Sequence, residues 1–140
     1  GSEMCIRDRT VTINVRELSL ETRASLAKEE GIPKEMLMEL AKDEEVGVRI
    51  NISANKSVPP ECLAKFAEDE LLAVRINVSA NPSTPADVLD KLSTENDEAI
   101  RANVAENPST SENTLKKLVN DEWLVARMKA AERLESLKKK

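Results

Sequence analysis

The sequence repeats one phrase at an interval of 26 residues, and this repetition constrains the fold more than any other feature. RINISANKSVP begins at Arg49, RINVSANPSTP at Arg75 and RANVAENPSTS at Arg101. The period extends without an insertion over five arginines, Arg23, Arg49, Arg75, Arg101 and Arg127. A catalytic motif usually occurs once, whereas a copied unit is typical of a repeat protein, in which each copy packs against its neighbours.

Each copy is expected to form two short helices. The first should start near an acidic residue that suits the helix dipole, run through the arginine and end near an asparagine. The acids are Asp43, Asp69, Glu95 and Asp121, and the asparagines are Asn55, Asn81 and Asn107. The second helix, about 85 to 93 in one copy, is expected to have Thr84 as N-cap, Pro85 as its first residue and Asp87 completing a capping box. Such a short helix can be partly 3-10.

These features predict an all-α fold, an α-solenoid of about four 26-residue repeats, each with an α-helix and a short α- or 3-10 helix, in a HEAT-like superhelix. Residues 23–126 hold the repeats, and residues 127–140 are expected to form a C-terminal capping helix with a basic tail. Residues 10–22 form an N-terminal cap or arm. Val11, Ile13 and Val15 alternate with polar residues as in a strand, but we favour a degenerate cap repeat in which Ser19 starts a helix. Residues 1–9 are interpreted as a tag or another non-native segment without a structural role.

The segment RINVSANPSTPADVLDKL, which begins at Arg75, resembles the leucine-rich repeat variant family. The resemblance covers Arg23 to Arg127 and rests on the arginine, the Asn-Pro turn and the Leu-x-x-Leu pair. It implies alternating α- and 3-10 helices in a right-handed superhelix without a β-sheet. The best-known members resemble an iron–sulfur protein with a cysteine-rich N-terminal region, which these residues do not contain, and the repeats here are slightly longer than the usual unit. The resemblance therefore indicates a fold rather than an activity.

Composition argues against several classes of function. A net charge of −5 disfavours nucleic acid and anionic membranes as partners, and the absence of histidine excludes imidazole chemistry. No apolar run approaches the roughly 20 residues that cross a bilayer. Cys5 and Cys62 lack the spacing of a metal site or a disulfide framework, so we expect a cytoplasmic protein. The carboxylates do not cluster and no glycine-rich phosphate loop occurs, so we expect no enzyme activity, no cofactor and no metal.

On a helical wheel, the repeated arginine falls in the middle of the apolar arc of the first helix. One interpretation is a ladder that binds phosphate or carboxylate ligands. The favoured interpretation is structural, with a partly buried guanidinium that pairs with the acid of an adjacent helix start and with carbonyl groups at helix ends. Glu98 is expected to contact Arg101 within their helix. Asn55, Asn81 and Asn107 are expected to form a second structural ladder by bonding the turn backbone or carbonyls of the neighbouring repeat.

Another row of asparagines falls on the opposite side of the wheel and is expected to face solvent, bordered by small residues. This row comprises Asn51, Asn77 and Asn103, with Gly47, Ala73 and Ala99 beside them. It can be the crowded inner side of a curved stack, or a concave groove whose amides read an extended ligand, one repeat per unit. The groove predicts that changing the three asparagines to lysine abolishes binding while the melting temperature hardly moves.

These observations favour a non-enzymatic scaffold that binds a protein or peptide on the concave face. The sequence does not identify the partner or the oligomeric state. A modular nucleic-acid-binding solenoid is an alternative, disfavoured by the acidic charge and by the presence of only two aromatic residues, Phe66 and Trp123. A purely architectural spacer from a longer repeat array is the third hypothesis.

Overall fold

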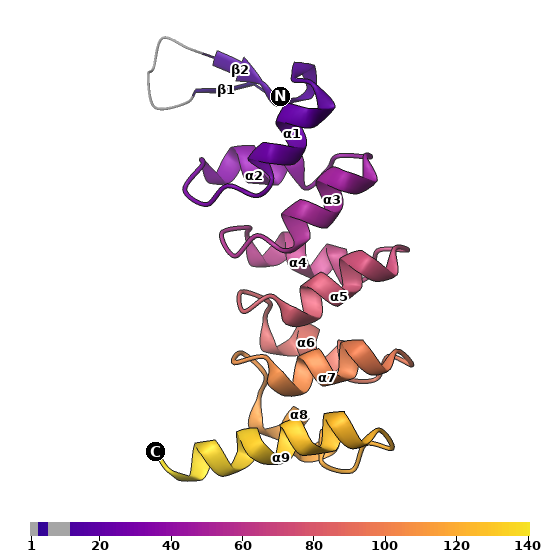
Figure 1. The fold of residues 1–140 in the computed structure, drawn as a ribbon. Helices are drawn as coiled ribbons and strands as arrows, with labels where there is room; N and C mark the ends of the chain where they lie inside the picture. The colour runs from indigo at the N-terminus through magenta and orange to yellow at the C-terminus, as the bar shows by residue number, and fades with distance from the viewer. Residues whose placement is uncertain (1–2, 6–11) are drawn as a thin grey trace.

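Residues 3–5 and 12–140 are described by the computed structural model, and most of them belong to short helices. Two strands, β1 (Glu3–Cys5) and β2 (Thr12–Asn14), and a 3-10 helix at Val15–Glu17 come first. The helices that follow are α1 (Leu20–Leu26), α2 (Lys34–Leu40), α3 (Val46–Ser53), α4 (Pro60–Phe66), α5 (Leu72–Ala80), α6 (Ala86–Leu92), α7 (Glu98–Glu106), α8 (Glu112–Leu118) and α9 (Leu124–Lys138). They follow one another along a single stack (Figure 1).

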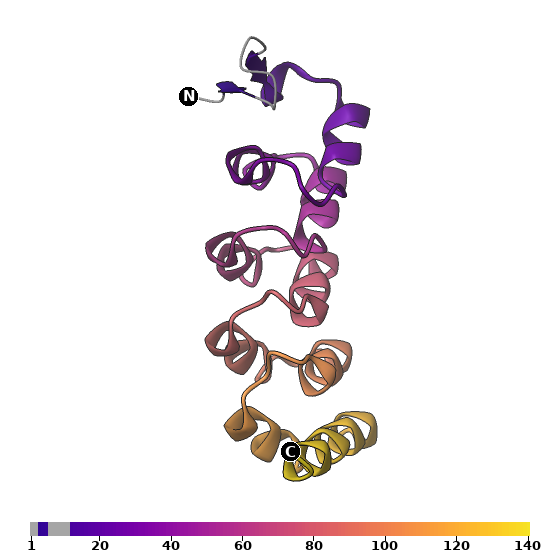
Figure 2. The ribbon, with the colours of Figure 1, turned by 90° about the vertical axis from the view of Figure 1, so that its left-hand side faces the viewer.

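The helices form two columns, one of odd-numbered and one of even-numbered helices (Figure 2). Successive members of the odd column contact one another, α1 with α3, α3 with α5, α5 with α7 and α7 with α9. The stack bows gently, and the odd column lies on its inner side (Figure 2). The repeat region is therefore the expected α-solenoid, in which each repeat adds one helix to each column.

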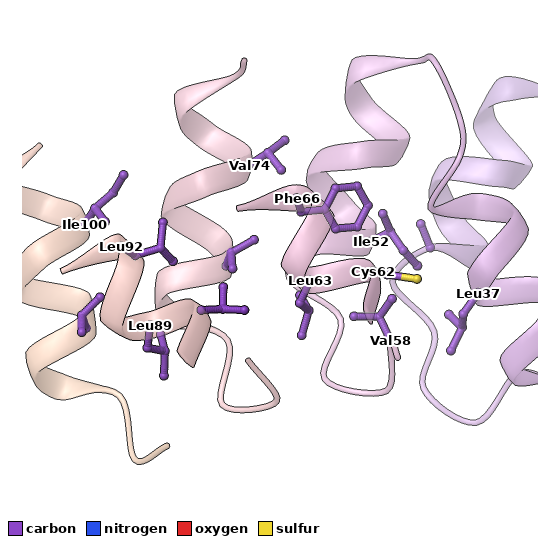
Figure 3. Close-up of a cluster of buried hydrophobic side chains, with 14 of the residues drawn as sticks. Leu37, Ile52, Val58, Cys62, Leu63, Phe66, Val74, Leu89, Leu92 and Ile100 are labelled. Atoms are coloured by element: carbon purple, nitrogen blue, oxygen red, sulfur yellow. The ribbon is translucent and has the colours of Figure 1, made fainter. Parts of the chain in front are cut away.

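Aliphatic side chains from both columns fill the space between them (Figure 3). Each of the four even helices buries a leucine at the same repeat position, with at most 1% of it exposed: Leu37, Leu63, Leu89 and Leu115. The odd column buries Val48, Val74 and Ile100 completely. Because burial of one such side chain contributes about 1.5–3 kcal/mol and all of them belong to one continuous cluster, the core extends along the stack without a break.

The N-terminal residues differ from the expectation. Thr12–Asn14 forms a strand, and Glu3–Cys5 of the same chain pairs with it in antiparallel register, Met4 opposite Ile13. The prediction that the first residues have no structural role is therefore wrong for this segment, which satisfies backbone groups that a lone strand leaves unpaired. The helix start at Ser19 is confirmed, because its hydroxyl accepts a hydrogen bond from the Thr22 amide at 3.1 Å. The rest of residues 1–9, together with Thr10 and Val11, lies outside the described residues.

The short helix after the Asn-Pro turn is capped differently from the prediction. It begins at Ala86, and Pro85 is its N-cap residue without a side-chain cap bond. Thr84 is not the N-cap, because its hydroxyl donates to the Val78 carbonyl of α5 at 2.7 Å. Thr110 makes the equivalent bond to the last turn of α7. The threonine therefore ties the start of a short helix to the end of the long helix before it.

Candidate interaction face and the ladders that support it

The repeated arginine joins its repeat to the next one through an acid twenty residues later. Arg23 Nε donates to Asp43 Oδ2 at 2.7 Å, and Arg49 Nε donates to Asp69 Oδ2 at 3.1 Å. Arg49 Nη1 also donates to the Glu44 carbonyl at 2.7 Å. This carbonyl lies in the turn before the helix of the arginine, and not at a helix end as predicted. The guanidiniums of Arg23 and Arg49 therefore fix their own helix start and the turn of the following repeat, whereas Arg127, among the described residues, bonds only the turn before its own helix.

The aspartates lie a few residues before the odd helices, and each bonds a backbone amide of its own turn as well as an arginine. Asp121 Oδ1 accepts a hydrogen bond from the Trp123 amide at 2.8 Å, which shapes the turn before α9. The same carboxylate accepts two bonds from Arg101, at 2.7 Å to Oδ2 and at 3.1 Å to Oδ1. The bonds from Arg101 hold the pKa of Asp121 below its ordinary value, and Asp121 raises the pKa of Arg101. Both groups therefore stay charged where burial alone favours the neutral forms.

We call each contact between a repeated arginine and the acid twenty residues later a joint. The third joint departs from the pattern because Glu95 occupies the position at which the other repeats have aspartate. Arg75 Nε lies 3.3 Å from Glu95 Oε1, but it makes no hydrogen bond within the described residues. The Glu95 side chain is 31% exposed, against 7–11% for the paired aspartates. The turn is stabilised instead by Asp97, which accepts a hydrogen bond from the Ile100 amide at 3.1 Å. This joint is therefore the least well bonded of the four.

The asparagine at the end of each long helix bonds the preceding repeat through both amide hydrogens. Asn81 Nδ2 donates to the carbonyls of Ser53 and Asn55 at 3.0 Å, and its Oδ1 accepts from the Ser83 amide at 2.9 Å. Asn107 repeats this arrangement one unit later. These side chains are buried, so their three bonds satisfy backbone groups that water does not reach.

The other row of asparagines does not face solvent as predicted. Asn51 Nδ2 donates to the Ala24 carbonyl at 2.9 Å, and Asn77 Nδ2 donates to the Ile50 carbonyl at 2.9 Å. Asn103 bonds the preceding repeat in the same manner. The prediction of a groove lined by free amide nitrogens is therefore wrong, because these nitrogens already donate hydrogen bonds to the preceding repeat. The small residues beside them are exposed: Gly47, Ala73 and Ala99.

A row of exposed aliphatic side chains runs along the same side of the odd helices. Leu20, Val46, Leu72 and Leu124 occupy one repeat position in α1, α3, α5 and α9, and 42–55% of each is exposed. We call these four residues the apolar row. Single exposed aliphatic residues are ordinary on protein surfaces, but a row that continues across neighbouring helices is typical of an interaction site. In α7 the same position is held by Glu98.

The sequence pattern alone does not reveal the apolar row, because its members fall within the apolar arc of the long helix and are therefore expected to be buried. The arc of apolar positions spans about 200° on the wheel. A helix that packs on one side needs an apolar stripe of only about 100°. An apolar arc about twice as wide as the packing requires therefore indicates that some of its side chains stay exposed.

The residues next to the apolar row in the sequence carry acids but no bases, although Arg16, Arg23 and Lys42 line the same hollow as Glu44 and Glu45. Residues 18–21, 44–47, 70–73, 96–99 and 122–125, which carry the row, include no lysine or arginine. The exposed glutamates in these stretches are Glu21, Glu44, Glu45, Glu70, Glu98 and Glu122, and we call four of them, Glu44, Glu45, Glu70 and Glu122, the acidic border. No ion pair forms at these glutamates or at Glu98 within the described residues. On the even column, by contrast, Lys117 pairs with Asp90 at 3.0 Å and Lys116 with Glu112 at 3.5 Å.

The expected contact between Glu98 and Arg101 is wrong. The Arg101 guanidinium bonds Asp121 and the carbonyls of Glu95 and Asn96. Glu98 is exposed and has only a distant electrostatic effect on Arg101, the smallest of the causes that raise its pKa. Its carboxylate therefore remains available to a partner.

Within the described residues, no three side chains of histidine, cysteine, aspartate or glutamate lie close enough together to hold a metal ion. No helix of the described part is long and apolar enough to cross a membrane. Cys62 is a buried free thiol, and burial raises its pKa.

The two columns and the ladders between them define an α-solenoid built from two-helix repeats. A solved structure described as a leucine-rich repeat variant with a novel repetitive protein structural motif shares this fold, with a TM-score of 0.64 and 24% sequence identity. The match covers 84% of this chain and 46% of that one, so the chain spans about half the length of the protein it matches. The resemblance seen in the sequence is thus confirmed for the fold. No protein-family model and no curated protein matches the chain.

Proposed function

We propose that this chain is a non-enzymatic scaffold that binds a segment of a partner protein along the inner side of the odd column. The observation that carries the proposal is the apolar row. Four aliphatic side chains at one repeat position remain 42–55% exposed, although the same helices bury Val48, Val74 and Ile100 completely. Packing of the repeats accounts for the buried positions and gives no reason for the exposed ones.

The neighbouring residues are consistent with a bound chain. Gly47, Ala73 and Ala99 follow the row along each helix and are exposed, so a partner backbone can approach the helix surface there. Asn51, Asn77 and Asn103 are proposed to border the site as structural supports that hold adjacent helices in register, since their amide nitrogens bond the preceding repeat. A cytoplasmic setting, expected from the cysteine spacing, belongs to the same proposal.

A display selection tests this function. The protein is immobilised and panned against random peptides, and the affinity of each enriched peptide is measured by fluorescence anisotropy on three proteins. V46K/L72K changes the apolar row, and A64K/A86K adds the same charge at exposed alanines of α4 and α6. We expect binding to fall at least about tenfold, or about 1.4 kcal/mol, in V46K/L72K and to persist in A64K/A86K. Equal affinity for all three proteins, or no enriched peptide, contradicts the proposal.

A further inference from the structure

Resting on the proposed function, we propose that the partner segment presents aliphatic side chains to the apolar row and a lysine or arginine to Glu98. The first observation is the order of residues at the apolar-row position of the odd helices. Aliphatic side chains stand at this position in α1, α3 and α5, a carboxylate stands in α7, and aliphatic side chains return in α9. The row is therefore interrupted once, and by a charge of known sign.

The second observation is that the Glu98 carboxylate makes no hydrogen bond or ion pair within the described residues. Asp97 caps α7 through the Ile100 amide, and the guanidinium of Arg101 is occupied by Asp121. The packing of α7 is maintained by Ile100 and Val104, which are completely buried. An acid near a helix start favours the helix dipole by about 0.3–1 kcal/mol, and Glu98 can make this contribution while its carboxylate also faces a partner.

The third observation is the unpaired acidic border. Glu44, Glu45, Glu70 and Glu122 are exposed next to the apolar row, and ion pairs to them are absent from the described part of the chain. On the even column, Lys34, Lys116 and Lys117 pair with acids of their own or the neighbouring repeat. A face that combines aliphatic groups with unpaired carboxylates complements a segment with aliphatic and basic side chains, because opposite charges select a partner and steer its approach.

The spacing of the row suggests a concrete probe. Packed helices lie about 8–10 Å apart, so successive members of the row are separated by a similar distance. A helix places every seventh residue on one face about 10.5 Å further along its axis. We would therefore use a labelled helical peptide with leucine at four successive heptad positions, of which the third is changed to lysine. One comparison peptide has glutamate at that position, and another keeps the lysine with serine at the three remaining positions. Each peptide is made in both chain directions.

The expected result is that the leucine–lysine peptide binds at least about tenfold more tightly than either comparison peptide at moderate salt. E98K should abolish this preference for lysine and favour the glutamate peptide, whereas E112K, a matched change on the even column, should not alter it. V46K/L72K should remove all binding. Sedimentation of the unlabelled protein is measured alongside, and the protein is expected to show no self-association that V46K/L72K abolishes.

The outcomes separate the two proposals. If the lysine and glutamate peptides bind equally and V46K/L72K removes both, the basic partner is wrong and the interaction face stands. If the serine–lysine peptide binds as well as the leucine–lysine peptide, charge alone acts and the inference is overturned. If no peptide binds, or V46K/L72K binds as well as the wild type, the proposed function itself fails. Self-association that V46K/L72K removes makes a second copy the occupant and overturns the basic segment.

Discussion

Arg101 and Asp121 bond through two nitrogens and two oxygens, at 2.7 and 3.1 Å, and so connect α7 to the turn before α9. Their side chains are only 9% and 7% exposed, which makes this the most buried ion pair among the described residues. The carboxylate also accepts the Trp123 amide. One aspartate thus shapes the start of the last helix and satisfies the arginine of the repeat before it.

Replacing this aspartate should weaken the C-terminal end of the stack. D121N leaves the Arg101 charge buried without a counter-charge, and removal of one partner of a buried pair costs about 3–5 kcal/mol. We expect the free energy of unfolding, measured in urea, to fall by about 3 kcal/mol. E122Q, at the exposed neighbouring position, serves as the control and should change it by less than about 0.5 kcal/mol. A loss in D121N no larger than in this control contradicts the role of the pair.

The same pair predicts how stability depends on pH. The pKa of Asp121 is lower in the folded protein than in the unfolded chain, because Arg101 favours the carboxylate. The stabilisation is therefore complete above the unfolded pKa, about 3.9 for aspartate, and is lost as pH falls through the folded pKa. We expect the difference in unfolding free energy between wild type and D121N to be constant at neutral pH and to shrink in acid. A difference that does not depend on pH, measured in urea at several pH values, contradicts this assignment.

At the third joint, between Arg75 and Glu95, a substitution can add a hydrogen bond where D121N removes one. E95D places an aspartate where the other three joints have one, so that one oxygen can reach Arg75 Nε and the other the Asp97 amide. Because Arg75 Nε is now a buried donor without a hydrogen bond among the described residues, the new bond should stabilise the fold by about 1 kcal/mol. D69E, which gives the second joint the longer side chain, should lower stability by a similar amount. Urea denaturation of both variants measures the two effects, and a shift in the same direction for both contradicts the argument.

The two rows of asparagine should differ in their contribution to stability. N81A leaves two carbonyls of the preceding repeat unbonded in a buried place, so we expect a loss of about 2–3 kcal/mol and faster hydrogen exchange at the Ser83 amide. N77A removes bonds from a half-buried position and should cost about 1 kcal/mol. Thermal and urea unfolding compare the two variants. If N77A leaves the melting temperature unchanged, the bonds of Asn77 do not stabilise the stack, which contradicts the expected contribution of this row.

The repeat unit and its most deeply buried positions could be predicted from the sequence, because a fixed period marks the positions that the copies share. The roles of Asn51 and Thr84 could not be predicted. A helical wheel gives direction around one helix, whereas both side chains bond groups outside their own helix, one in the preceding repeat and one in the preceding helix. Glu98 was assigned to Arg101 from their spacing within α7, but a better acid, Asp121, arrives from twenty residues later. Contacts between neighbouring elements therefore decided the roles of Asn51, Thr84 and Glu98.

The apolar row should be separable from the core by stability alone. L72S changes a side chain that is 42% exposed, so the free energy of unfolding should change by less than about 0.5 kcal/mol. V74A, two residues along the same helix, removes two methyl groups from a completely buried position and should cost about 2 kcal/mol. Urea denaturation measures both variants, and anisotropy with a peptide from the display selection measures binding. The expected pattern is that L72S keeps its stability and loses affinity, whereas V74A loses stability and keeps its affinity at a temperature where it remains folded. A large loss of stability in L72S would show that the row belongs to the packing of the repeats, and the interaction face would then have to be sought elsewhere on the stack.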